Sequence, residues 1–425
     1  MSKNLIFIIC LLILYLIAGY IPNFAAADRI APQWLYLGYL NLITLLVIPL
    51  LKDNSNFKSV LKSWPTILLI SFILWNGFSY LYAVNKSETL IELTRWINIL
   101  IALINTSYLL SKVNNPSKWI VYLMLIAFTI EFSYSFYQYI QFTKFFDYNF
   151  SFANDIKGIT ANKNITSASI TSKLPFILFI ILSNNKVFSL IGRVLFILGL
   201  YTILLLSARA SYISIFGIIF FIILVFSIRD FKQQKFLLLR QKAPLILLLF
   251  FSVITASTLI LGKDNNASIT ERITTINTED TSTNQRLRYY GHALTHFKNN
   301  PLIGVGLGNW KIKSIEYDRL NMQSYIVPYH VHNDFLQIAT ETGIIGFLLY
   351  LLIFIYIGIN CFKNAIDLKN PYSWEYLTIG LSLMVYFIDA NLNFPHARVI
   401  NQVVFIFLIA YFISLNLKEK EFQNG

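Results

Sequence analysis

Two histidines separated by one residue have the type and spacing best suited to acid–base chemistry in this chain. His330 and His332 lie in the segment P-Y-H-V-H-N-D, which also contains Asn333 and Asp334. Imidazole titrates near neutral pH, so a positioned histidine can accept a proton from a hydroxyl group as that group attacks an electrophile. The segment is therefore the first candidate for a catalytic site.

Two other interpretations of these histidines stay open at this point. Zinc takes about three or four protein ligands, and two histidines with one nearby aspartate make an incomplete set. Cys10 and Cys361 lie in apolar runs without metal-type spacing, so they add no ligands. We therefore expect no metal and no cofactor. The histidines could also be an ordinary pair at a membrane interface.

Five charged residues stand within or at the ends of long apolar runs, and they are Arg95, Glu131, Lys173, Arg209 and Asp389. A charge at the centre of a membrane helix costs about 2.5–3.5 kcal/mol on insertion scales, so such residues are functional candidates. Arg209 lies in S-A-R-A-S, where two runs meet with almost no loop. Its planar guanidinium could bind a phosphate group bidentately, or it could anchor the helix end at the lipid headgroups.

The other four charged residues have simpler structural explanations. Arg95 follows Glu92 by three residues, which predicts an ion pair on one helix face. The side chain of Lys173 is long enough to reach the outer membrane surface. Glu131 and Asp389 are expected to pair with cations inside the helix bundle.

The composition identifies the elements that must position these groups. Of the 425 residues, 56% are hydrophobic and 13% are charged, whereas a soluble domain is about one quarter charged. An ordinary soluble enzyme, a disordered chain and a disulfide scaffold are excluded. The sequence predicts an all-α integral membrane protein with about twelve transmembrane helices, because a span needs about 20 apolar residues. Such runs occur at about 5–21, 34–51, 64–83, 91–110, 118–140, 166–183, 188–207, 211–228, 243–261, 343–362, 373–390 and 397–415.

The formal charge of +13 has a topological explanation. If the N-terminus is cytoplasmic, the inward segments hold seventeen of the 34 basic residues and six acidic residues, a net charge of +11. Basic residues collect in short cytoplasmic loops, so we expect both termini in the cytoplasm and no nucleic-acid partner. The run 5–21, followed by three alanines at 25–27, could instead be a secretory signal. Its 17 residues exceed a signal core of about 7–15 residues, so a retained first helix is the better interpretation.

One outward segment is much longer than the others and carries the candidate chemistry. It covers 262–342, between the ninth and tenth spans, and it contains four of the five histidines. A structureless loop of this length is uncommon, and apolar residues at helical spacing predict an amphipathic helix from Asn284 to Asn299. We therefore expect three regions, namely nine spans over 1–261, a partly helical loop over 262–342, and three spans with a short tail over 343–425.

Several motifs together resemble a bacterial family. Residues 332–346, which have the pattern H-N-x9-G-x-x-G, resemble the signature of the O-antigen ligase and O-antigen polymerase superfamily. Residues 286–290 and 300–309 are similar to that family's R-L-x-x-W and P-L-x-G-V-G-x-G-N motifs, with Tyr290 where the family commonly has tryptophan. The turn at 207–211 and the segment 162–168 add sparser matches.

The resemblance implies a fold like that of C-type glycosyltransferases, with the long loop at the periplasmic face of the bacterial inner membrane. It implies that a glycan is transferred from an undecaprenyl-diphosphate carrier to an acceptor hydroxyl, with inversion at the anomeric carbon and without a metal or cofactor. The partners would be this donor, a lipid A core or growing glycan as acceptor, and membrane lipids.

The same resemblance gives the candidate residues expected roles. His332 is expected to be the general base and His330 the second choice, with Asn333 or Asp334 orienting the ring. Asn333 and Asp334 are also expected to contact the substrate. A diphosphate leaving group needs cations that hold its charge. The expected cations are Arg209, Arg286 and Arg288.

Other functions remain open from the sequence. Ligases and polymerases share these motifs, so we expect an O-antigen ligase, with polymerisation of carrier-linked repeats as the alternative and transfer to protein Ser or Thr as a less favoured one. A transporter is disfavoured, because transporters commonly place polar groups near the membrane midplane in two related halves. Here the polar groups gather in one loop.

Overall fold

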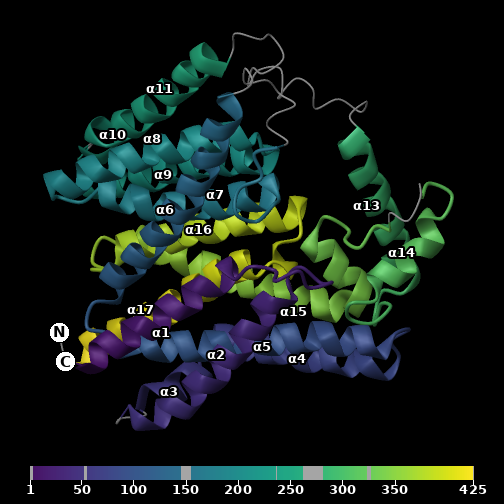
Figure 1. Cartoon of the computed structure of the whole chain (residues 1–425). Coiled ribbons are helices and arrows are strands. Elements are labelled where there is room, and N and C mark those ends of the chain that lie inside the picture. Colours follow the sequence, from purple (N-terminus) through teal and green to yellow (C-terminus); the bar gives the residue numbers. More distant parts are fainter. Residues whose placement is uncertain are drawn as a thin grey trace. The chain divides into compact units, whose positions relative to one another are not determined.

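The computed structural model describes residues 3–51, 55–144, 155–235, 237–261, 281–322 and 327–424, and every regular element in these ranges is a helix (Figure 1). The α-helices are α1 (Lys3–Ile17), α2 (Ala31–Val47), α3 (Ser55–Leu61), α4 (Trp64–Phe78), α5 (Lys86–Ser111), α6 (Pro116–Thr143), α7 (Lys163–Ile181), α8 (Lys186–Leu206), α9 (Arg209–Gln233), α10 (Leu237–Gln241), α11 (Ala243–Leu261), α13 (Thr281–Asn299), α14 (Trp310–Asp318), α15 (Asp334–Ala365), α16 (Ser373–Leu392) and α17 (Val399–Asn424). Short 3-10 helices are η1 (Ala18–Tyr20), η2 (Ile48–Leu50), η3 (Ser79–Leu81) and η6 (Pro395–Ala397). The all-α prediction is confirmed.

Ten helical segments in these ranges are long and apolar enough to cross a membrane. Three of them combine two helices, namely α1 and η1, α4 and η3, and α10 and α11. The other seven are α5, α6, α7, α8, α9, α15 and α17. The two other predicted spans are also helices. α2 has only 17 residues, and α16 has 20 residues with Glu375 and Asp389 near its ends. A polytopic membrane protein is confirmed, with ten of the twelve predicted spans supported by both length and apolarity.

The chain folds into two compact units, and neither is one continuous stretch. The first unit combines Met1–Pro116, Thr278–Ile357 and Asp389–Gly425. The second unit combines Ser117–Asn277 and Gly358–Ile388. The division into three consecutive regions, based on the loop alone, stays a prediction.

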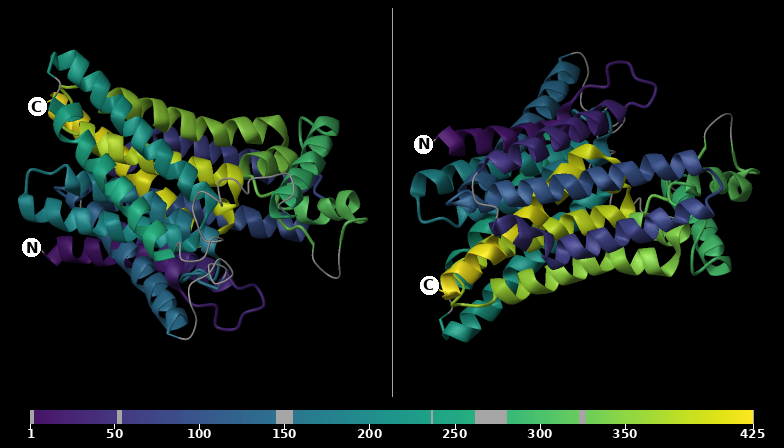
Figure 2. Two further views of the ribbon diagram at one scale, coloured as in Figure 1. Left: turned by 90° about the horizontal axis from the view of Figure 1, so that it is seen from above. Right: turned by 90° about the horizontal axis from the view of Figure 1, so that it is seen from below.

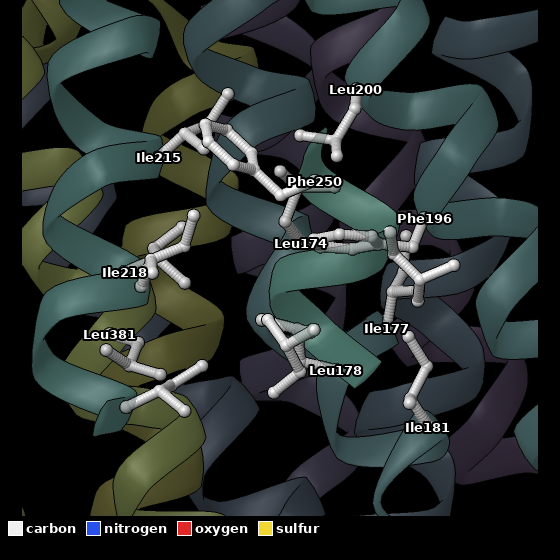
Figure 3. Close-up of a cluster of buried hydrophobic side chains, with 14 of the residues drawn as sticks. Leu174, Ile177, Leu178, Ile181, Phe196, Leu200, Ile215, Ile218, Phe250 and Leu381 are labelled. Atoms are coloured by element: carbon white, nitrogen blue, oxygen red, sulfur yellow. The ribbon is translucent and has the colours of Figure 1, made fainter. Parts of the chain in front are cut away.

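Apolar side chains from α6, α7, α8, α9, α11, α15 and α16 form the core of the second unit, and Figure 3 shows part of it. Small residues let two of these helices approach closely, since a Cβ at Gly192 of α8 would lie 2.9 Å from the side chain of Ile181 on α7. Close packing of this kind is a main force between helices in lipid. The labelled core residues are Leu174, Ile177, Leu178 and Ile181 of α7, Phe196 and Leu200 of α8, Ile215 and Ile218 of α9, Phe250 of α11 and Leu381 of α16.

One pair of charged side chains is buried inside the second unit. The Nζ of Lys173 on α7 lies 3.0 Å from each carboxylate oxygen of Glu131 on α6. It also donates to the carbonyl and hydroxyl oxygens of Ser169, at 2.8 and 2.7 Å. Both charged side chains are at most 1% exposed. The prediction that Glu131 pairs with a cation is confirmed, and Lys173 is held in the bundle rather than at the surface.

Two shorter helices of the long loop lie at one end of the long helices α4, α5 and α15 in the first unit, as Figures 1 and 2 show. The helix predicted for Asn284 to Asn299 is confirmed as α13, which begins three residues earlier, at Thr281. Between α13 and α14, Gly306 has a φ of 100° and Gly308 a φ of 74°. Glycine adopts such values readily, so the glycine-rich motif turns the chain between the two loop helices.

A break in α15 holds this glycine-rich segment in place. Gly343 has a φ of 72° and a ψ of −171°, which interrupts the helix and frees carbonyl groups in the preceding turn. The carbonyl oxygen of Glu341 accepts the backbone N–H of Gly306 at 2.8 Å. A Cβ at Gly343 would lie 2.0 Å from the carbonyl oxygen of Leu302. The glycine of the H-N-x9-G pattern is therefore required by backbone conformation and by close packing.

Candidate functional site

Three separate segments of the first unit meet around the predicted catalytic histidines. They are α13, the stretch 327–333, and the connection 393–398 that contains η6. A small core of Ala293, Trp310 and Val331 joins the first two segments to α14, and each of these side chains is at most 1% exposed. Val331 lies between the two histidines in the sequence, so its burial fixes the backbone that carries both.

His332 combines an unusual backbone conformation with an unpartnered ring nitrogen. Its φ is 63°, in a region that residues other than glycine rarely adopt, and such strain is concentrated at functional sites. The hydroxyl of Tyr290 donates to its carbonyl oxygen at 2.9 Å, and the ring of Phe394 lies edge-on, 5.0 Å between centroids. The buried Nδ1 of His332 has no hydrogen-bond partner among the residues that the structure describes.

The electrostatic environment keeps His332 neutral. Burial and, after it, the positive charge of Arg286 lower the pKa of His332 to about 4. At pH 7 the imidazole is therefore unprotonated, and a nitrogen lone pair is available to accept a proton.

His330 is held more firmly than His332. Its Nδ1 lies 3.3 Å from Oε1 of Gln337, which also accepts the backbone N–H of Val331 at 3.2 Å. Because that oxygen can only accept, Nδ1 carries the proton and Nε2 keeps the lone pair. The ring stacks on Phe394 with centroids 4.4 Å apart. Burial first, and then nearby positive charges with His396 foremost, hold the pKa of His330 well below its usual range.

A third histidine, which the sequence analysis missed, completes the cluster. His396 in η6 is 8% exposed, and its Nδ1 and backbone N–H lie 2.6 and 3.0 Å from the carboxylate oxygens of Asp334. Its ring meets that of His330 edge to face at 5.8 Å and stacks with Trp96 at 6.4 Å. Burial acts to lower the pKa of His396, but the carboxylate of Asp334 raises it to about 9. An imidazolium therefore lies next to His330 at neutral pH.

The contacts of Asn333 and Asp334 correct their expected role as ring orienters for His332. Asp334 binds His396, which follows it by 62 positions. Asn333 acts as the N-cap of α15, since its Oδ1 accepts the backbone N–H of Leu336 at 2.9 Å. Both residues thus position backbone next to the histidines. The one sequence signal for His396 was a polar residue in the short connection before the last apolar run.

The two arginines of α13 have different surroundings. Arg286 donates to the carbonyl oxygen of Leu392 at 2.8 Å, at the end of α16. Arg288 pairs with Asp318 of α14, with 2.8 Å from Nε to Oδ1 and 3.3 Å from Nη2 to Oδ2. The Arg288 pair joins the two loop helices, so this guanidinium already has a carboxylate partner.

Arg209 belongs to the second unit, where it is the first residue of α9. Helix α8 ends at Leu206, Ser207 adopts a left-handed conformation with a φ of 53°, and α9 begins at Arg209. The tight turn predicted for S-A-R-A-S is therefore confirmed. The role of Arg209 toward a phosphate group stays a prediction.

No group of three or more His, Cys, Asp and Glu side chains in the described ranges is arranged to hold a metal ion. The zinc interpretation of His330 and His332 therefore gains no third ligand from these residues.

Fold and site together define a multi-pass membrane protein whose histidine cluster is formed by its long loop and by the connection between α16 and α17. A protein-family model described as O-antigen ligase matches residues 194–351, which include Arg209, Arg286, His330 and His332. The match confirms the resemblance to the O-antigen ligase and polymerase superfamily. The chain is accordingly a multi-pass membrane protein, and its residues 194–351 are similar to O-antigen ligases. No curated protein matches the chain.

Proposed function

We propose that this protein transfers a glycan from an undecaprenyl-diphosphate carrier to an acceptor hydroxyl, in the manner of an O-antigen ligase. The environment of His332 is the observation that supports this proposal. Its buried Nδ1 has no hydrogen-bond partner in the described structure, and its lowered pKa leaves the ring neutral at pH 7. The charge of Arg286 acts on the same ring. A neutral base beside a cation suits the attack of a hydroxyl on a diphosphate-linked sugar.

The proposed step moves one proton and exchanges one bond. The acceptor oxygen forms a bond to the anomeric carbon while His332 takes the hydroxyl proton. The bond from the anomeric carbon to the diphosphate oxygen breaks, and the diphosphate leaves with the electron pair on its carrier. Attack from the opposite face inverts the anomeric configuration in a single displacement. The step as proposed uses no metal ion and no cofactor.

Arg286 is proposed to stabilise the negative charge on the leaving diphosphate. Any contact of Arg209 with a phosphate group stays a prediction from the sequence. Arg288 receives a structural role instead, because Asp318 already pairs with it. Arg286→Lys keeps the charge but loses the planar fork, so we expect donor use to fall by about tenfold. Arg288→Lys is the matched control, with a smaller effect. Unchanged donor use by Arg286→Lys would contradict the proposed clamp.

We also propose that the reaction occurs at the periplasmic face of the inner membrane, with both termini in the cytoplasm. The distribution of basic residues supports this orientation. A fluorescent protein fused to the C-terminus is then expected to fold and fluoresce, whereas a cysteine introduced on the exposed face of α14 would react with a membrane-impermeant reagent added from the periplasm. The reverse pattern would overturn the orientation.

The direct test measures glycan transfer by the full-length protein in membrane vesicles supplied with a lipid-linked donor. His332→Ala is expected to lower the rate by about 10²–10⁴-fold. His292→Ala serves as the matched control, because His292 on α13 pairs with Asp318 and has no proposed catalytic role. Undiminished transfer by His332→Ala would remove this residue from the mechanism.

Product analysis in a deletion strain identifies the acceptor. Loss of all glycan linked to lipid A is the result expected for a ligase. Retention of single repeat units on lipid A would instead identify a polymerase, and loss of glycan from protein Ser or Thr would identify a protein oligosaccharyltransferase.

A further inference from the structure

A polar cavity of about 540 Å³ lies in the first unit beside His330. Its lining comes from the loop 27–30, the beginnings of α5 and α14, the segments 329–330 and 337–341, and the two residues before α17. The volume falls within the range of about 300–1,000 Å³ that is typical of small-ligand sites. The roles proposed above for His332 and Arg286 do not use this cavity.

Several charged side chains of the cavity already have ionic partners. Arg95 binds Glu92 at 2.5 Å, as their spacing predicts, and it binds Asp28 at 2.9 Å. Lys311 binds Glu88 at 2.5 Å. Lys311 and Glu88 balance each other, whereas the pairing of Arg95 with two carboxylates leaves one net negative charge.

Glu341 is the remaining acidic residue of the cavity lining, and its carboxylate accepts hydrogen bonds from the protein. The carboxylate of Glu341 accepts the backbone N–H groups of Gly308 and Trp310, at 2.8 and 3.3 Å, at the start of α14. It also accepts the side-chain amide of Gln337 at 3.3 Å. Its negative charge is therefore directed at the turn between the loop helices.

Two arginines of the cavity have no such partner. Within the described ranges, neither the Arg29 nor the Arg398 guanidinium forms an ion pair or a hydrogen bond, and the Nε of Arg398 is buried. The guanidinium of Arg398 lies 5.1 Å from the centre of the Phe394 ring, which stacks on His330. The cavity therefore presents two guanidinium groups without a direct ion pair next to the candidate catalytic segment, and Asp28 acts on Arg398 only through its longer-range charge.

We propose that this cavity binds an anionic substituent, a carboxylate or a phosphate, carried by a saccharide. A guanidinium presents N–H groups in a planar fork that matches the oxygens of either anion, and an anion would give the Nε of Arg398 an acceptor. The exposed Tyr329 in the lining offers its hydroxyl to a sugar, whereas the amide of Gln337 already binds His330, Val331 and Glu341. The saccharide part rests on the proposed glycan transfer, whereas the anion site rests on the cavity and its two arginines.

Equilibrium binding to the full-length protein in phosphatidylcholine nanodiscs tests the site without turnover. The probes are glucuronate, inorganic phosphate and uncharged glucose. We expect glucuronate or phosphate to bind at least about tenfold more tightly than glucose, and Arg29→Gln and Arg398→Gln each to weaken that binding by about tenfold. Arg319→Gln, which removes an exposed arginine at the end of α14, is the matched control and keeps wild-type affinity.

Two binding results would overturn the proposal. One is equal affinity for glucuronate, phosphate and glucose, and the other is wild-type anion affinity in both arginine variants. Arg29 lies in an exposed loop, so its variant provides the result even where Arg398→Gln fails to fold.

Transfer kinetics in vesicles identify the substrate that carries the anion. If the acceptor carries it, Arg398→Gln raises the KM for the acceptor by about tenfold with little change in kcat. If the donor glycan carries it, the KM for the donor rises instead. Unchanged KM values for both substrates contradict the proposal. Absence of transfer by the wild-type protein would refute the proposed function. The binding of glucuronate and phosphate would still test whether the cavity is an anion site.

Discussion

Two groups of buried polar and charged side chains have their hydrogen bonds satisfied to very different degrees. In the second unit, the Lys173 ammonium contacts four oxygen atoms of Glu131 and Ser169. In the first unit, the Nδ1 of His332 and the Nε of Arg398 are buried without a hydrogen-bond partner among the described residues. An unsatisfied buried group costs about 1–3 kcal/mol, so it calls for an explanation such as a ligand that supplies the missing bond. We infer that the Lys173–Glu131 pair maintains the fold and that His332 and Arg398 are available to substrates.

The largest expected effect is on stability and comes from the satisfied pair. Lys173→Met leaves the Glu131 carboxylate buried without its cation, which is expected to lower the free energy of unfolding by about 3–5 kcal/mol. The double variant Lys173→Met/Glu131→Gln should recover most of the loss, because no uncompensated charge remains. Thermal unfolding in detergent measures both. A single variant as stable as the wild type would show that the pair does not maintain the fold.

A substitution at the break in α15 tests how the fold holds the segment that contains His332. Gly343→Ala is expected to destabilise the protein by about 1–3 kcal/mol and to lower glycan transfer, because its φ is 72° and the new Cβ would meet the backbone of Leu302. Gly358→Ala is the matched control, since nothing lies within 4 Å of its added Cβ and α15 is helical there. Equal unfolding temperatures for the two variants would contradict this account of the motif glycine.

The Asp334–His396 pair predicts a pH dependence of stability in the histidine cluster. The folded pKa of His396 is about 9, above its ordinary value of 6.5, so the stabilisation is fully present below pH 6.5 and is lost as the pH rises through about 9. Asp334→Asn should cost about 1.5–3 kcal/mol at pH 6 and flatten this dependence. Unfolding temperatures from pH 6 to pH 10 measure it, with Asp318→Asn as control. Parallel curves for the wild type and Asp334→Asn would refute the assignment.

The smallest expected effect concerns the backbone of His332. Tyr290→Phe removes the hydroxyl that donates to the His332 carbonyl oxygen, which is expected to cost about 0.5–1.5 kcal/mol and to lower transfer by a few fold. Tyr289→Phe is the neighbouring control, since its hydroxyl has no hydrogen-bond partner among the described residues. If the two variants transfer glycan equally well, the Tyr290 bond does not position His332.

Local features of the fold were predictable from the sequence. Helical spacing of apolar residues located α13, and the three-residue spacing of Glu92 and Arg95 predicted their ion pair. The short link between two apolar runs predicted the turn before Arg209. These features depend on neighbours within a few residues, so periodicity and spacing contain the necessary information.

Contacts between distant segments were not predictable in the same way. Arg288 pairs with Asp318, 30 positions away, and Asp334 binds His396, 62 positions away. Sequence spacing gives no distance for such pairs, so Asp334 and Arg288 were expected to serve His332 and a diphosphate instead. The cavity at Arg398 depends on six separate segments and had no sequence signal at all.

The pH dependence of glycan transfer in vesicles tests the role of His332 most directly. A base must be unprotonated to act, so kcat/KM is expected to stay level as the pH falls from 7 to 5 and to drop only as it approaches the pKa of His332, about 4. His332→Ala should lower kcat/KM by about 10²-fold or more and abolish this acid limb. An acid limb near pH 6.5, or one that persists in His332→Ala with wild-type rates, would contradict His332 as the general base.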